Sequence, residues 1–123
     1  MRAVFGAKGA TIEPLSLGMS LPQFALVWLG LGTDGHIASL FPSSDPDASA
    51  PPRVIDLTPE PLPSGAPFSP LTLTLAALAN ADGVIVVARG AKKRQLIDAA
   101  LAGADLPLTR LFAMTPVTLY WCL

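Results

Sequence analysis

Charged side chains are scarce in this chain of 123 residues. Asp, Glu, Lys and Arg make up 14% of it, against about 25% in a typical soluble domain. Eight basic and nine acidic residues leave a net charge of −1, without a basic stripe or an acidic tail. Such a chain is a poor partner for nucleic acids and for anionic membranes, so we expect neither kind of binding.

Cysteine and histidine each occur once, as Cys122 and His36. One cysteine cannot form an internal disulfide, and one cysteine with one histidine cannot build a zinc site of the usual kind. The sequence also lacks a cluster of carboxylates that would suggest another metal. We therefore expect no bound metal.

Long apolar runs are missing too, although 51% of the residues are hydrophobic and the mean hydropathy is +0.53. The longest run is Phe24–Leu31, far shorter than the roughly 20 residues of a membrane-spanning helix. The first residues, MRAVFGAKGATIEP, contain no apolar core of secretory length and no cleavage-like ending. The sequence thus predicts a cytoplasmic protein.

Apolar patterning predicts strands that alternate with helical segments. Strands are expected at Phe24–Leu31, Arg53–Leu57, Leu71–Leu75, Val84–Ala88 and Val117–Cys122. The first of these, a continuous apolar run, is typical of a strand covered on both faces. A turn is expected at Asp82-Gly83. Helical segments are expected at His36–Phe41, Ala76–Ala81 and Ala91–Leu101, the last ended by Gly103.

This alternation is typical of an α/β fold, here a Rossmann-like, mostly parallel sheet with flanking helices. We expect residues 1–123 to form a single domain. The helical segments are few and short for a complete doubly wound domain, which predicts that part of such a fold is missing.

The stretch GLGTDGHIASLFP carries the candidate chemistry. Gly30, Gly32 and Gly35 follow an apolar run and fit the G-x-G-x-x-G pattern of dinucleotide sites. That interpretation needs a long helix after the third glycine, whereas Pro42 would end it early. Asp34 would also place a carboxylate beside the pyrophosphate, where like charges repel. The dinucleotide interpretation is therefore disfavoured.

The same loop also fits a catalytic turn, because open α/β sheets bind ligands beyond the carboxyl ends of their strands. His36 would lie on the first turn of a short helix, whose free amides can hold an anion or a developing oxyanion. An imidazole with a pKa near 6.5 can take a proton from water, and Asp34 could orient the ring or hold the turn. Residue type alone favours a structural role, since most lone histidines are structural and Asp-Gly is most often only a turn.

The stretch closely resembles the signature G-x-G-x-D-G-H-x-A-S-L-F-P-G of the 6-phosphogluconolactonase family, departing at Ser43. The related glucosamine-6-phosphate deaminases share GxDGH but continue AFNEP, so ASLFP favours the lactonase. Looser likenesses follow at PLTLTLAAL, where Pro70 stands in place of a common Arg, and at VIVVARGAKK, LPLTRL and VTLYWCL. The likeness covers residues 24–123 well and the first twenty poorly.

The resemblance implies hydrolysis of a small sugar phosphate, 6-phosphogluconolactone, to 6-phosphogluconate in the oxidative pentose phosphate pathway, without a cofactor or a metal. His36 would activate water, supported by Asp34. Gly30, Gly32 and Gly35 would form the loop against the substrate.

Cations at the start of the 91–101 helix are the candidates for binding the substrate's phosphate. Lys93 matches the position of the family's lysine, and Lys92 is the alternative if the register differs. A simpler interpretation also stands, in which these are solvated basic side chains on a first helical turn. We expect Arg89 to be a surface or loop residue.

Proteins of the family are roughly twice as long, and their N-terminal half supplies a Gly-rich phosphate loop that does not appear here. The chain thus resembles the C-terminal half of a lactonase. Two alternatives stand beside the enzyme. One is a non-catalytic remnant that binds phosphosugars or self-associates through exposed apolar surface. The other is a glucosamine-6-phosphate isomerase or deaminase.

Overall fold

The computed structural model describes residues 8–42, 49–57 and 71–123. Two positions that entered the sequence argument, Ser43 and Pro70, lie outside the described residues. Residues 8–23 form neither helix nor strand, in agreement with the weak patterning of this part of the sequence.

The centre of the fold is a three-stranded parallel sheet in the order β1-β4-β5. Its strands are β1 (Phe24–Gly30), β4 (Ala81–Arg89) and β5 (Thr118–Cys122). A second, antiparallel pair joins β2 (Val54–Asp56) to β3 (Leu71–Leu73). The expected α/β fold with a mostly parallel sheet is confirmed.

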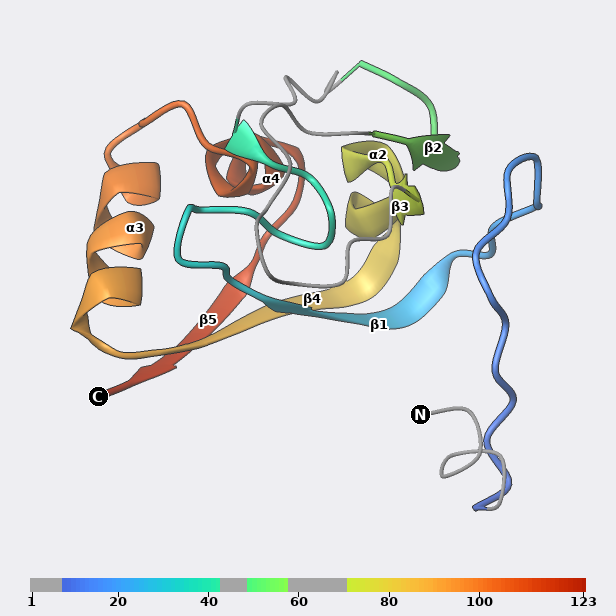
Figure 1. Ribbon diagram of the computed structural model, residues 1–123, viewed down its shortest axis with the longest axis horizontal. Helices are drawn as coiled ribbons and strands as arrows, with labels where there is room; N and C mark the ends of the chain where they lie inside the picture. Colours follow the sequence, from blue (N-terminus) through green and yellow to red (C-terminus); the bar gives the residue numbers. More distant parts are fainter. Residues whose placement is uncertain (1–7, 43–48, 58–70) are drawn as a thin grey trace.

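All three labelled helices lie on one side of the parallel sheet (Figure 1). They are α2 (Leu75–Ala79), α3 (Ala91–Leu101) and α4 (Pro107–Met114). The helical layer therefore covers a single face of the sheet.

None of the helices in the described part of the chain is long and apolar enough to cross a membrane.

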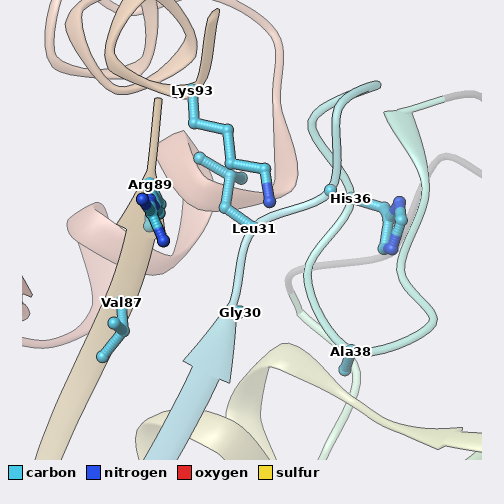
Figure 2. A pocket seen from close by; sticks show the side chains of 9 residues that line it. Gly30, Leu31, His36, Ala38, Val87, Arg89 and Lys93 are labelled. Atoms are coloured by element: carbon cyan, nitrogen blue, oxygen red, sulfur yellow. The ribbon is translucent and has the colours of Figure 1, made fainter. Parts of the chain in front are cut away.

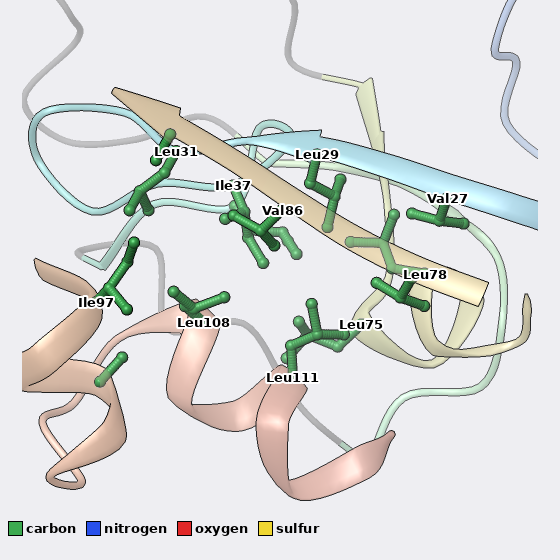
Figure 3. Packing of buried hydrophobic residues seen from close by; sticks show 14 residues of the cluster. Val27, Leu29, Leu31, Ile37, Leu75, Leu78, Val86, Ile97, Leu108 and Leu111 are labelled. Atoms are coloured by element: carbon green, nitrogen blue, oxygen red, sulfur yellow. The ribbon is translucent and has the colours of Figure 1, made fainter. Parts of the chain in front are cut away.

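The core fills the space between this helical layer and the sheet (Figure 3). Leu108 and Leu111 of α4 and Val86 of β4 are fully buried. Ile37 and Leu40, from the loop after β1, are also fully buried. The loop that carries the candidate chemistry is thus anchored in the core rather than laid over the surface.

The opposite face of the sheet is open. Leu26 and Trp28 of β1 are 53% and 69% exposed, Tyr120 of β5 is 56% exposed, and Val87 of β4 is 37% exposed. These side chains alternate with buried ones along β1 and β4 and with partly buried ones along β5, as a half-covered sheet requires. The expectation that Phe24–Leu31 is covered on both faces is therefore wrong for this chain.

Local sequence signals explain which element boundaries were predicted. Helix α3 begins and ends at the expected residues because Gly90 precedes it and Gly103, at φ +95°, follows it. The N–H groups of Gly103 and Ala104 donate to the carbonyls of Ala100 and Ala99, which is the Schellman pattern at a helix end.

Two expectations about elements are corrected, and one helix was not expected. The strand expected at Leu71–Leu75 ends at Leu73, because the Thr74 hydroxyl accepts a hydrogen bond from the Ala77 N–H and caps α2. The turn expected at Asp82-Gly83 lies inside β4. Helix α4 was missed, although Pro107 at its first turn is a usual start signal.

Candidate active site

A tight turn follows β1 and holds the two candidate catalytic side chains. The Gly35 N–H donates to the Gly32 carbonyl at 3.0 Å, and the Gly32 N–H donates to the His36 carbonyl at 2.9 Å. Gly35 has φ +92°, a conformation that favours glycine. The glycines therefore fold the chain back on itself, so that residues 34 and 36 lie at the carboxyl end of β1.

Asp34 and His36 form a close side-chain pair. Nδ1 of His36 lies 2.5 Å from Oδ1 of Asp34, and the same oxygen accepts a hydrogen bond from the His36 backbone N–H at 3.1 Å. Because an ionised carboxylate can only accept, Nδ1 carries the hydrogen in this pair. In the neutral ring, Nε2 then holds the lone pair and can accept a proton.

The environment of Asp34 favours its ionised form. Partial burial raises the pKa of Asp34, but the hydrogen bonds from the His36 ring and backbone and the charge of the imidazole outweigh this, so the pKa of Asp34 lies below its ordinary value of 3.8. The carboxylate is therefore available at neutral pH to hold the His36 tautomer.

Two further residues fix the His36 ring. Phe41 packs against it, with ring centroids 4.8 Å apart and planes tilted by 32°. On another side, a Cβ added to Gly32 would overlap the imidazole. Gly32 is thus required by the closeness of the ring, and the role of Phe41 was not identified from the sequence.

The segment after His36 is a two-residue turn, so the helix expected at His36–Phe41 is wrong. Ile37 and Leu40 exchange backbone hydrogen bonds of 3.2 and 2.8 Å around Ala38 and Ser39. Ala38 has φ +49°, as the turns that suit such a hairpin require.

Among residues 35–40, the backbone amides are already hydrogen-bonded except that of Ala38, which has no acceptor among the described residues. The amides of Gly35, His36, Ile37 and Leu40 all donate within the loop. That of Ser39 donates to the hydroxyl of Thr72, which is buried on β3. The chain thus gives no support to an oxyanion site built on a helix N-terminus here.

A cavity of about 480 Å³ opens at the carboxyl ends of β1 and β4. His36 lies on one side of it, and Lys93 and Arg89 lie on the other (Figure 2). It is lined by Gly30, Leu31, Gly32, His36, Ala38, Val87, Ala88, Arg89 and Lys93. Its size falls in the range of about 300–1,000 Å³ that is usual for small-molecule sites.

The structure brings most of the predicted site residues together. The cavity is lined by Gly30, Gly32, His36 and Lys93. Asp34 lies outside the lining and contacts His36.

Gly35 is buried beneath the loop, and Lys92 is exposed and outside the cavity lining. The cavity therefore favours Lys93 over Lys92. Arg89 is exposed, as expected, and it also belongs to the cavity lining. The signal that could have found Arg89 is its position directly after the buried strand.

Within the described part of the chain, no group of three or more His, Cys, Asp or Glu side chains could hold a metal ion. His36 and Asp34 together supply only two side chains of these types. The arrangement can hold a histidine in one tautomer beside a cavity that carries positive charge.

Comparison with known proteins relates this chain to one protein family. Residues 4–121 match the profile of the family described as glucosamine-6-phosphate isomerases/6-phosphogluconolactonase. The chain is 41% identical over 110 residues to a 6-phosphogluconolactonase from Pseudomonas putida, covering 83% of this chain and 43% of the relative. It is 35% identical over 100 residues to one from Helicobacter pylori J99, covering 79% of this chain and 42% of the relative.

A solved structure agrees. The crystal structure of a 6-phosphogluconolactonase from Shewanella baltica OS155 matches with a TM-score of 0.64 and 25% identity, over 97% of this chain and 50% of that one. The chain thus spans about half the length of the proteins that it resembles. Since the family profile matches nearly the whole chain, this chain belongs to the glucosamine-6-phosphate isomerase/6-phosphogluconolactonase family.

Proposed function

We propose that this chain carries the catalytic loop of a lactonase that hydrolyses 6-phosphogluconolactone to 6-phosphogluconate. The observation that carries the proposal is the 2.5 Å contact between Nδ1 of His36 and Oδ1 of Asp34, at the edge of a cavity that a lysine also lines. Relatives named 6-phosphogluconolactonase, at 35% and 41% identity, support the same reaction. The cytoplasmic location and the assignment to the oxidative pentose phosphate pathway stay predictions from the sequence.

In the proposed reaction, His36 acts as a general base and then as a general acid. Nε2 accepts a proton from water while the water oxygen bonds to the lactone carbonyl carbon. The tetrahedral intermediate then breaks the bond between that carbon and the ring oxygen, which takes the proton from Nε2. The product is an open-chain acid, and proton transfer of this kind contributes about 10²–10⁴-fold to the rate.

Asp34 would keep Nε2 ready for this proton by holding Nδ1–H and by stabilising the imidazolium that forms. Lys93 would hold the phosphate of the substrate from the far side of the cavity (Figure 2). Gly30 and Gly32 would let the substrate approach the backbone closely, because they carry no side chain. We expect no metal or cofactor to take part.

Two substrates separate the lactonase from the deaminase alternative. The proposal predicts that the chain consumes 6-phosphogluconolactone faster than buffer alone and releases no ammonia from glucosamine 6-phosphate. Ammonia release without lactone consumption would contradict the lactonase and support the deaminase. The proposal that residues 1–123 form one domain, equivalent to the C-terminal portion of a lactonase, is tested by whether the isolated chain unfolds in one cooperative step.

A second candidate is a self-associating chain without activity, and the open sheet face favours it. Leu26, Trp28, Val87 and Tyr120 expose apolar surface across all three parallel strands. β1 and β5 also end the sheet, so each has one unpaired edge among the described strands. We propose that a second copy of the chain covers this face.

Light scattering after size exclusion tests this association. The chain should elute as a dimer or larger species, and Trp28→Ser should shift it towards the monomer, because the Trp28 side chain is the most exposed of the four. Leu101→Ser is a matched control, since Leu101 is 64% exposed but lies on α3, on the other side of the sheet. A monomeric wild-type chain would contradict the proposal.

A further inference from the structure

Arg89 has no role in the reaction as proposed above, although it lines the same cavity as His36 and Lys93 (Figure 2). It is the last residue of β4. Lys93 lies in the first turn of α3, which begins directly after the connecting residue Gly90. The two cations therefore come from consecutive elements and lie on the side of the opening opposite His36 (Figure 2).

The cavity lining carries two fixed positive charges and no carboxylate. The salt bridges found among the described residues involve other cations, so neither Arg89 nor Lys93 pairs with an Asp or Glu side chain in this part of the chain. Two like charges on one small cavity repel each other. An anionic ligand that binds between them would remove this repulsion.

Arg89 is held in place through its Nε–H. This group donates to a main-chain oxygen of Leu123, the last residue of the sequence, at 3.2 Å. The two Nη groups of Arg89 have no partner among the described residues. A guanidinium with free Nη groups presents a planar pair of donors that matches two oxygens of a phosphate.

The connection between the two cations is also fixed. The Gly90 N–H donates to the Cys122 carbonyl at 2.9 Å, and the Gly90 carbonyl accepts from Nε1 of Trp121 at 2.8 Å. Gly90 itself has φ +99°. The start of α3 is thereby tied to β5, which fixes the backbone between Arg89 and Lys93.

We propose that Arg89, together with Lys93, binds the phosphate of the substrate, and that Arg89 sets the preference for phosphorylated over unphosphorylated sugar acids. A phosphomonoester carries a charge of about −1.5 to −2 at pH 7. Two cations therefore match a phosphate better than they match a carboxylate, which carries a single negative charge. The inference rests on the proposed function for the identity of the substrate. The anion site itself does not depend on hydrolysis.

Equilibrium binding to the intact chain tests this proposal. Titration calorimetry and amide NMR shifts at Gly90 and Ala91 would follow 6-phosphogluconate, gluconate and inorganic phosphate. We expect wild type to prefer 6-phosphogluconate to gluconate, and Arg89→Gln to weaken 6-phosphogluconate binding about tenfold or more while leaving gluconate unchanged. Arg89→Lys, which keeps one charge but not the fork, should give an intermediate loss.

Arg94→Gln is the matched control, because Arg94 pairs with Asp98 and stacks on Trp121 outside the cavity lining. It should bind 6-phosphogluconate like wild type. The proposal is overturned if wild type does not prefer 6-phosphogluconate, if Arg89→Gln keeps the wild-type affinity, or if it weakens both sugar acids equally. A melting curve for each variant identifies loss of fold, and if Arg89→Gln unfolds, the Arg89→Lys titration decides.

Lactone hydrolysis, measured on the same samples, keeps the two claims separate. Arg89-dependent phosphate binding without hydrolysis would support this inference and contradict the proposed function. Hydrolysis with phosphate binding that does not depend on Arg89 would support the proposed function and contradict this inference.

Discussion

Replacing Gly32 by alanine tests whether the position of His36 is set by the loop. The added Cβ would overlap the imidazole, so the ring must move and its 2.5 Å contact with Asp34 must break. Gly30→Ala is the matched control, because a Cβ at Gly30 meets no heavy atom within 4 Å. Both changes add one methyl group to a glycine that lines the cavity.

The expected magnitudes differ for stability and for rate. The Asp34–His36 pair is partly exposed, at 53% and 36% of the two side chains, so its loss should cost about 0.2–1 kcal/mol of unfolding free energy. A misplaced general base should lower the rate about 10²–10⁴-fold, which equals about 2.7–5.4 kcal/mol of activation free energy. The loss of rate should therefore greatly exceed the loss of stability.

Two assays decide the matter. His36 is the only histidine, so its Cε1–H gives a single NMR resonance that should shift in Gly32→Ala and stay in place in Gly30→Ala. Chemical denaturation and lactone consumption give the two free energies. Gly30→Ala is the control for the ring position only, because Gly30 also lies against the substrate in the proposed reaction. Equal behaviour of the two variants in the resonance would refute the reasoning.

Three more predictions follow from the same geometry. Gly35→Ala should lower the unfolding free energy by more than about 1–2 kcal/mol, because the φ of Gly35 is +92° and the new Cβ meets a leucine side chain at 2.9 Å. Gly18→Ala is the control, since Gly18 has φ +80° and its added Cβ meets no neighbour within 4 Å. In the same denaturation assay, Gly18→Ala should show the conformational cost alone. Asp34→Asn should lower the free energy of unfolding above pH 3.8. The difference from wild type should vanish as the pH falls through the lowered pKa of Asp34, because wild type then loses the same charge. Chemical denaturation at several pH values measures this difference, and one that persists at pH 2 would contradict the prediction. Lys93→Gln should weaken 6-phosphogluconate binding about tenfold or more in a calorimetric titration, whereas Lys92→Gln, outside the cavity, should not; equal losses would show a general charge effect instead.

The sequence predicts elements well where the signals are local. Ala91–Leu101 is found from one glycine before the helix and another after it, and the structure has the same bounds. The apolar run Val84–Ala88 lies inside the longer strand β4. Each of these elements is specified by residues next to it in the chain.

The segment His36–Phe41 fails as a helix because distant contacts decide it. Ile37 and Leu40 are both fully buried, and the Ser39 N–H is held by Thr72, 33 residues away. A two-residue turn satisfies these contacts, and a helix would not. Helical propensity along the segment contains no information on the position of Thr72.

For the candidate site, the motif identified His36 and Asp34, and the structure places them in contact. Arg89 was not identified, because an arginine after a strand looks like a surface residue until the cavity beside it is known. The apolar run Phe24–Leu31 predicted two covered faces, whereas Trp28 is 69% exposed. Burial of the second face depends on polypeptide that packs on the sheet, which a single strand cannot specify.

The central claim is that His36 activates water for attack on a sugar-phosphate lactone. The most direct test is the rate of 6-phosphogluconolactone consumption by the wild-type chain and by His36→Ala, each corrected for spontaneous hydrolysis. The account predicts a corrected rate above zero for the wild type and a loss of about 10²–10⁴-fold in His36→Ala, or a corrected rate of zero where spontaneous hydrolysis exceeds the residual activity. Equal rates for the two chains would contradict it.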